Sequence, residues 1–127
     1  MTIEQATKNK LLARTQIVAI VNNRIYYPYL PQTPVYPAIS FFLISGQRHH
    51  DIDVAYPYYQ FDSWALTYMQ AIQLANEIRL ALQREKGIWD GIPIIQGVFK
   101  NETDVEEPNN PNLFHRASDF EIIYKGI

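Results

Sequence analysis

Four potential metal ligands lie within five residues of a predicted loop: His49, His50, Asp51 and Asp53. Imidazole and carboxylate groups bind divalent cations, so this loop is a candidate centre for a small metal-dependent hydrolase or nuclease. Adjacent histidines converge on one ion only if the loop bends, and structural metal sites usually draw ligands from two elements. We favour a solvated loop with no metal and no cofactor, and keep the hydrolase as an alternative that metal analysis would reveal.

The remaining titratable groups do not combine into a recognisable catalytic set. His115 stands beside Arg116 without a nucleophile that the sequence can pair with it, so a surface or partner contact is the favoured interpretation. Asp104, Glu106 and Glu107 precede a segment with two prolines, and a mobile hairpin tip could not hold two carboxylates at the separation that acid and base catalysis needs. There is no glycine-rich phosphate loop and no nucleophile elbow. We therefore predict that the protein is not an enzyme.

Composition narrows the class of protein. The chain has 127 residues, 47% of them hydrophobic, a formal charge of −2 and no cysteine. We expect a single domain over residues 1–127 that needs neither disulfides nor cysteine-bound zinc. The basic residues are scattered, which argues against sequence-specific nucleic-acid binding, and no apolar run is long enough for a membrane span.

Two helices must position these groups. Thr67 and Gln70 form a capping box, so a long helix should begin near Tyr68, with a buried stripe at steps of three and four residues and an end at Gly87. The stripe consists of Ala71, Leu74, Ala75, Ile78, Ala81 and Leu82. A second box, Thr2 with Gln5, predicts a first helix over residues 3–13 with a helical continuation to Val21.

Strands are expected at residues 24–27, 38–45, 58–64, 92–100 and 114–125. The strand at 38–45 is apolar on both sides, which predicts cover on both faces, and the last strand alternates as a half-buried strand does. Prolines at three-residue spacing, from Pro28 to Pro37, make a tyrosine-rich extended connector; it could be a polyproline ligand, but we favour a segment lying on its own domain. The predicted fold is α+β, a mostly antiparallel four- to five-stranded sheet with two helices packed on one face.

Apolar side chains are also predicted on the surface. Met69, Ile72 and Leu80 lie on the side of the long helix opposite its buried stripe, where they could contact another subunit. On the sheet face away from the helices, Tyr58 and Trp64 flank Gln60 and Asp62, a mixture typical of protein interfaces. Scattered exposed hydrophobic residues are the alternative interpretation. A monomeric module that binds a peptide along an open sheet edge also stays open.

The order of several segments resembles the tail completion proteins, or tail terminators, of long-tailed bacteriophages. The similar segments are residues 24–28, 30–32, 37–41 closing on Ser45 and Gly46, 59–65 running into Thr67 and Ala71, and 114–124. Together they cover most of the chain, and their ordered combination carries the resemblance. Pro57 and Ser63 depart from the residues that more often continue the strand in this family.

The resemblance implies a mechanical role in the virion, after assembly in the host cytoplasm. A homohexameric ring would cap the head-proximal end of the tail tube, end tube polymerisation and join the tail to the head connector or stopper protein, with room for DNA to pass through. Two long polar loops joined to strands should then reach neighbouring or axial partners. The candidate contact residues in these loops are Gln47, Arg48, His49, His50 and Asp51 in one, and Asp104, Glu106 and Glu107 in the other.

Overall fold

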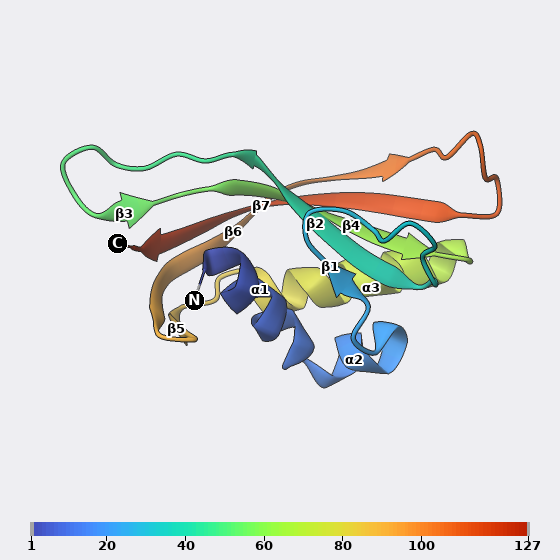
Figure 1. Cartoon of the computed structure of the whole chain (residues 1–127), viewed down its shortest axis with the longest axis horizontal. Helices are drawn as coiled ribbons and strands as arrows, with labels where there is room; N and C mark the ends of the chain where they lie inside the picture. Colours follow the sequence, from blue (N-terminus) through green and yellow to red (C-terminus); the bar gives the residue numbers. More distant parts are fainter. Residues whose placement is uncertain (1, 127) are drawn as a thin grey trace.

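The computed structural model describes residues 2–126, which form a curled sheet with all helices on one face (Figure 1). Within that range there are three helices and a seven-stranded sheet. The elements are α1 (Ile3–Leu12), α2 (Thr15–Val21), β1 (Ile25–Tyr26), β2 (Ala38–Ser45), β3 (Val54–Ala55), β4 (Tyr58–Ala65), α3 (Tyr68–Leu82), β5 (Gly87–Trp89), β6 (Ile92–Val105) and β7 (Phe114–Lys125).

The strand order is β1-β2-β4-β7-β6-β5, with β3 pairing with the far end of β7. The α+β class is confirmed, but four to five antiparallel strands and two helices were too few. β1, β3 and β5 are two or three residues long, too short to show a periodic pattern. The sheet is also mixed, because the connector of residues 27–37 carries the chain back so that β1 runs parallel to β2.

The helix starts follow the predicted capping chemistry. The hydroxyl of Thr67 accepts a hydrogen bond from the backbone N–H of Gln70 at 3.2 Å, and Thr2 accepts one from Gln5 at 3.1 Å. The predicted first helix and its continuation are two separate helices, α1 and α2, which break at Ala13 and Arg14.

The predicted end of α3 at Gly87 is wrong. The helix stops at Leu82, Gln83 is already extended, and Arg84 has a positive φ of 62°. The backbone N–H of Arg84 then donates to the carbonyl of Gly97 at 2.8 Å, and Gly97 donates back to Glu85 at 3.0 Å. The chain leaves the helix early because it pairs with β6, and Gly87 becomes the first residue of β5.

The core lies between α3 and the sheet. All six residues of the predicted helix stripe are buried, and Tyr59 and Phe61 of β4 pack in the same cluster as Leu74 and Ile78. Phe61 stacks on Phe41 of β2 with ring centroids 4.9 Å apart and meets Phe120 of β7 edge-on at 5.5 Å. The sheet is therefore fixed to α3 through neighbouring aromatic residues on three adjacent strands.

Two strand predictions need correction. β2 is buried only in its first half, since β1 pairs with Ile39 and Ser40 alone, and Leu43 and Ile44 are exposed. β6 continues to Val105 and pairs with β7 as far as His115. The acidic segment predicted as a loop from residue 101 is thus strand up to Val105, held there by backbone pairing and by the guanidinium of Arg116.

Candidate assembly surfaces

The two polar segments predicted to reach partners project from opposite ends of the molecule. In Figure 1 the β2–β3 loop extends at the left and the β6–β7 hairpin at the right, along the longest axis. Both continue from strands of the same sheet. The fold can therefore present two different polar surfaces to two different partners.

The β2–β3 loop carries Gln47, Arg48, His49, His50 and Asp51, all exposed. The Nδ1 atom of His49 accepts a hydrogen bond from the backbone N–H of Asp51 at 3.2 Å, and Arg48 pairs with Asp53 at 3.3 Å. Among residues 2–126, no three histidine, cysteine or acidic side chains are arranged to hold a metal ion. In this conformation the loop offers polar contact groups and does not gather its four possible ligands around one point.

The acidic residues of the β6–β7 hairpin occupy three different environments. Asp104 accepts from the Nε of Arg116 at 2.7 Å and from the hydroxyl of Tyr68 at 3.3 Å. The hydrogen bond from Arg116 is the main reason why the pKa of Asp104 lies below its usual range. Glu106 is exposed, whereas Glu107 turns toward His115. Asp104 is thus exposed, as expected for this acidic segment, but it is paired and lies in a strand, and Glu107 is half-buried against His115.

His115 forms the most enclosed polar cluster, and the sequence expectation of a surface contact is wrong. Its side chain is 8% exposed, with Nε2 2.7 Å from Asp62 Oδ1 and Nδ1 2.9 Å from Glu107 Oε1. The ring stacks on Trp64 with centroids 3.8 Å apart. Burial acts to lower the pKa of His115, but hydrogen bonds and charge from the two carboxylates outweigh it, so the pKa is raised.

This cluster holds structure together and lacks the geometry of a catalytic triad. Both imidazole nitrogens already face carboxylates, so neither is free to take a proton from a substrate. The nearby hydroxyl of Ser40 accepts from the indole N–H of Trp64 at 2.9 Å. Sequence reasoning placed Asp62 and Trp64 on the correct sheet face but missed His115, because only the β4–β7 register puts His115 opposite Trp64.

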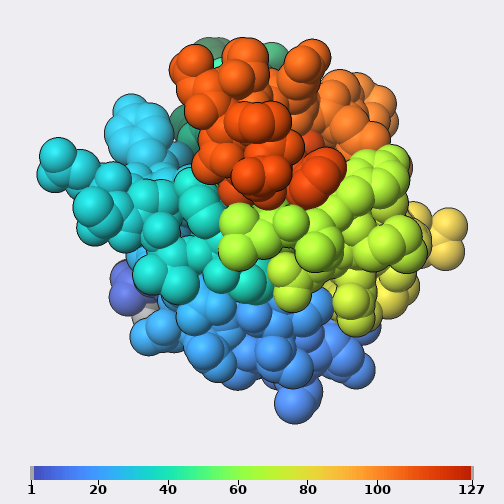
Figure 2. Space-filling view, turned by 90° about the vertical axis from the view of Figure 1, so that its right-hand side faces the viewer, coloured from blue at the N-terminus to red at the C-terminus, as the bar shows by residue number. Residues whose placement is uncertain are grey.

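Apolar groups are exposed on the solvent side of α3. Met69 is 72% exposed and Leu80 47%, while Ile72 is half-buried. A groove of about 430 Å³ runs between this side of α3 and the β6–β7 hairpin. It is lined by Met69, Ile72, Gln73, Asn76, Arg79, Glu102 and Arg116. The space-filling view shows the hairpin above the beginning of α3 (Figure 2).

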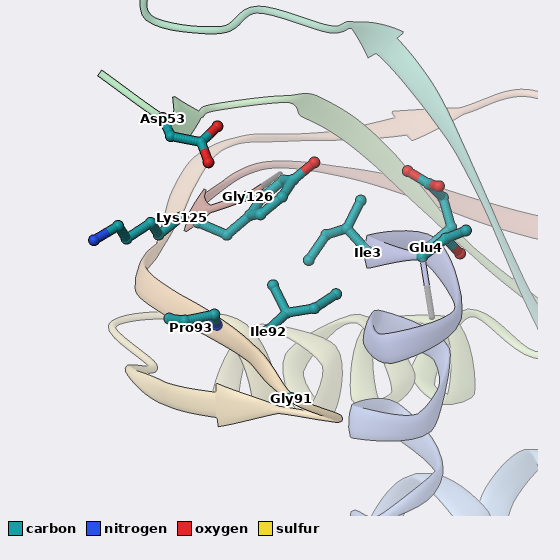
Figure 3. A pocket seen from close by; sticks show the side chains of 10 residues that line it. Ile3, Glu4, Asp53, Gly91, Ile92, Pro93, Lys125 and Gly126 are labelled. Atoms are coloured by element: carbon teal, nitrogen blue, oxygen red, sulfur yellow. The ribbon is translucent and has the colours of Figure 1, made fainter.

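A second hollow, of about 630 Å³, lies where α1, β6 and the end of β7 meet (Figure 3). Its lining is partly apolar, with Ile3, Ile92 and Pro93, and carries the charged groups of Glu4, Asp53 and Lys125. Glu4 accepts a hydrogen bond from the hydroxyl of Tyr59, whose pKa is raised chiefly by burial. Its charged groups come from separate elements, and Glu4 is already engaged by Tyr59.

Two comparisons with known proteins give matches. Residues 6–125 match the family described as tail completion protein gp17. A solved structure titled "Virion of native gene transfer agent (GTA) particle" contains a chain of similar fold, with a TM-score of 0.78 at 14% identity, covering 98% of this chain and 95% of that one. Comparison with curated proteins gives no match. Among residues 2–126, no helix has the length and apolar character that crossing a lipid bilayer requires.

The family match spans nearly the whole chain and includes both polar segments and α3. It agrees with the resemblance seen in the order of the sequence segments. It argues against the two alternatives, a metal-dependent hydrolase or nuclease and a monomeric module that binds a peptide along a sheet edge. This chain belongs to the tail completion protein gp17 family and is a structural protein of the phage virion, not an enzyme.

Proposed function

We propose that the protein acts as a hexameric ring that caps the head-proximal end of the tail tube, ends tube polymerisation and joins the tail to the head connector. The observation that carries this proposal is the projection of two different polar segments from opposite ends of the molecule (Figure 1). One segment suits a tube subunit and the other a connector or stopper subunit, with the flanks of the molecule between them left for neighbouring copies.

A ring of this kind explains how growth stops. A growing tube presents the same stacking face after every layer, so a terminator must match that face on one side and present a different surface on the other. The β2–β3 loop carries Arg48, two histidines and two aspartates, whereas the charged residues of the β6–β7 hairpin from residue 101 to residue 112 are all acidic. Two surfaces whose side chains differ in this way would not both accept the same tube subunit.

Contacts that close the ring would be made by the sides of the molecule that lie between the two polar segments. Head-to-tail contacts that close by rotation form a ring without open ends. If the ring is stable alone, each neighbour contact should bury at least about 1,000 Å² in total; a smaller contact would require the tube as a template. Met69, Ile72 and Leu80 are the proposed contact residues on α3. The likeness of fold to a chain from a gene transfer agent virion supports an assembly role in a virion.

The test is to produce particles that lack this protein. We expect tails of uncontrolled length that do not attach to filled heads, measured as the tail-length distribution and the fraction of joined particles in negative-stain images. Supplying the wild-type protein in trans should restore both quantities. Tails of normal length that still join heads would refute the proposal.

A further inference from the structure

The connector between β1 and β2 is an uncharged, exposed segment that the core does not account for. Residues 27–37 contain no ionisable acid or base other than tyrosine, and Tyr29 is 78% and Val35 61% exposed. Part of the connector is anchored, because Tyr27 packs on Phe41 at 5.0 Å and the carbonyl of Pro37 accepts from Arg24 at 2.8 Å. Its middle therefore protrudes from a fixed base.

The groove beside α3 lies at the other side of the sheet. β1 and β2 form one edge of the strand order, while the groove borders β6, next to the opposite edge. In Figure 2 the connector protrudes at the left, in cyan, and the beginning of α3 with the hairpin above it lies to the right. Two different surfaces on opposite flanks are what a head-to-tail ring requires.

The chemistry of the groove suits an uncharged occupant. The guanidinium of Arg79 already donates to Gln83 and Asn76, and that of Arg116 donates to Asp104 and Glu102. An apolar segment over these groups would leave both guanidinium groups hydrogen-bonded, Arg116 to carboxylates and Arg79 to the neutral amides of Gln83 and Asn76, so no donor would lose all its partners. Met69 and Ile72 give the same groove an apolar side.

The proline content of the connector adds to the match. The connector contains four prolines, which restrict its backbone and lack N–H donors: Pro28, Pro31, Pro34 and Pro37. Docking therefore immobilises few rotatable backbone bonds and buries few N–H groups without a hydrogen-bond acceptor. The prolines thus suit a segment that loses little backbone freedom when it binds. Every copy of this chain carries both the connector and the groove, so a neighbouring copy can supply the groove that the connector needs.

We infer that the connector of one copy docks in the α3–hairpin groove of the next copy, with Val35 and Tyr29 against Met69 and Ile72. This inference rests on the proposed ring and specifies how its neighbours meet. The contact is heterologous, so each copy gives its connector to one neighbour and receives a connector from the other.

Cysteine pairing tests this contact directly, because the chain contains no cysteine of its own. Val35→Cys and Met69→Cys proteins are mixed and treated with a short bis-maleimide linker. We expect a single cross-linked dimer from the mixture and none from either protein alone. The double variant should give a ladder that ends at the ring size measured by native mass spectrometry.

The matched control pairs Val35→Cys with Ile88→Cys, since Ile88 is 71% exposed, as Met69 is 72% exposed, but lies on β5 outside both surfaces. No dimer is expected from that pair. A dimer of Val35→Cys alone, or equal cross-linking to Ile88→Cys, would overturn the inference. If the wild-type protein formed rings but the Val35→Cys and Met69→Cys proteins gave no cross-linked dimer, the inference would be overturned and the proposed ring would stand. A wild-type protein that stays monomeric at all concentrations and on isolated tail tubes would overturn both.

Discussion

At the scale of single residues, the imidazole of His115 links strand β4 to the turn of the β6–β7 hairpin. It lies between Asp62 of β4 and Glu107 of the hairpin turn, and its ring stacks on Trp64. A cation between two carboxylates is favoured over the neutral ring, which is why the pKa of His115 is raised despite burial. The charge state of this residue therefore controls how firmly the hairpin base is attached to the sheet.

This arrangement predicts a pH-dependent contribution to stability. Because the folded-state pKa lies above the ordinary value near 6.5, the stabilisation is complete below that value and is lost as pH rises through the raised pKa. We expect His115→Phe, which keeps a planar ring against Trp64, to lower the free energy of unfolding by about 2 kcal/mol below about pH 6. The loss should shrink as the pH is raised, in urea denaturation at a series of pH values.

His50→Phe is the matched control for that experiment. His50 is exposed in the β2–β3 loop, so its replacement should leave the pH dependence of the free energy of unfolding unchanged. If the His115→Phe protein lost the same free energy at every pH between about 5.5 and about 8.5, the ring would contribute packing alone.

At the scale of elements, the end of α3 lies close against the middle of β6. A Cβ at Gly97 would lie 2.0 Å from the carbonyl oxygen of Leu82, which belongs to the backbone and has little room to move. The two hydrogen bonds between Gly97 and the Arg84–Glu85 segment hold the same junction. Glycine is required here because the last turn of the helix lies directly on the strand.

We accordingly expect Gly97→Ala to lower the free energy of unfolding by at least about 2 kcal/mol, through a forced separation of α3 and β6. Equilibrium urea denaturation measures the change. Gly46→Ala is the matched control, since its Cβ would meet only the side chain of Leu43, at 3.4 Å, and should change stability by less than about 0.5 kcal/mol. Equal effects of the two substitutions would contradict the proposed role of the junction.

The same junction shows where sequence reasoning about elements succeeds and where it stops. The start of α3 follows from Thr67 and Gln70, and its buried stripe follows from residue spacing, because both are local signals. Its end at Leu82 follows from pairing between Arg84 and Gly97, which the sequence alone does not show. β7 was predicted with its observed bounds because twelve residues give a clear alternation, unlike the two residues of β1 or β3.

For the candidate surfaces, the sequence located the segments but not their contacts. The β2–β3 loop, the exposed side of α3 and the acidic hairpin were all recognisable from polarity and spacing. The His115 cluster and the α3 groove were not, because each depends on which strands are neighbours in the sheet. The connector was expected to lie on its own domain; its ends do so and Leu30 and Pro34 are half-buried, whereas Tyr29 and Val35 are exposed.

At the scale of the whole molecule, the two projecting segments should have separate roles. We expect a short turn in place of residues 47–52, or in place of residues 106–112, to leave the fold intact and to disrupt assembly on one side only. One replacement should change tail length, and the other should leave capped tails that fail to join heads. Tail length and head attachment in negative-stain images distinguish the two defects.

Replacements of the same segments by glycine and serine at unchanged length provide the control. They retain the reach of each loop and remove its charges, so they separate length from side-chain chemistry. Assembly that survives both shortened loops, with tail length and head attachment unaltered, would show that neither segment contacts a partner.

The strand β7 runs along the longest axis, with the β6–β7 hairpin at its start and the β3 end of the β2–β3 loop beside its last residues (Figure 1). It is bonded to β4 on one side and to β6 on the other over most of its length. A pull between the two ends would load these backbone hydrogen bonds together in shear rather than peel them apart singly. The fold should therefore resist unfolding under tension applied along its longest axis.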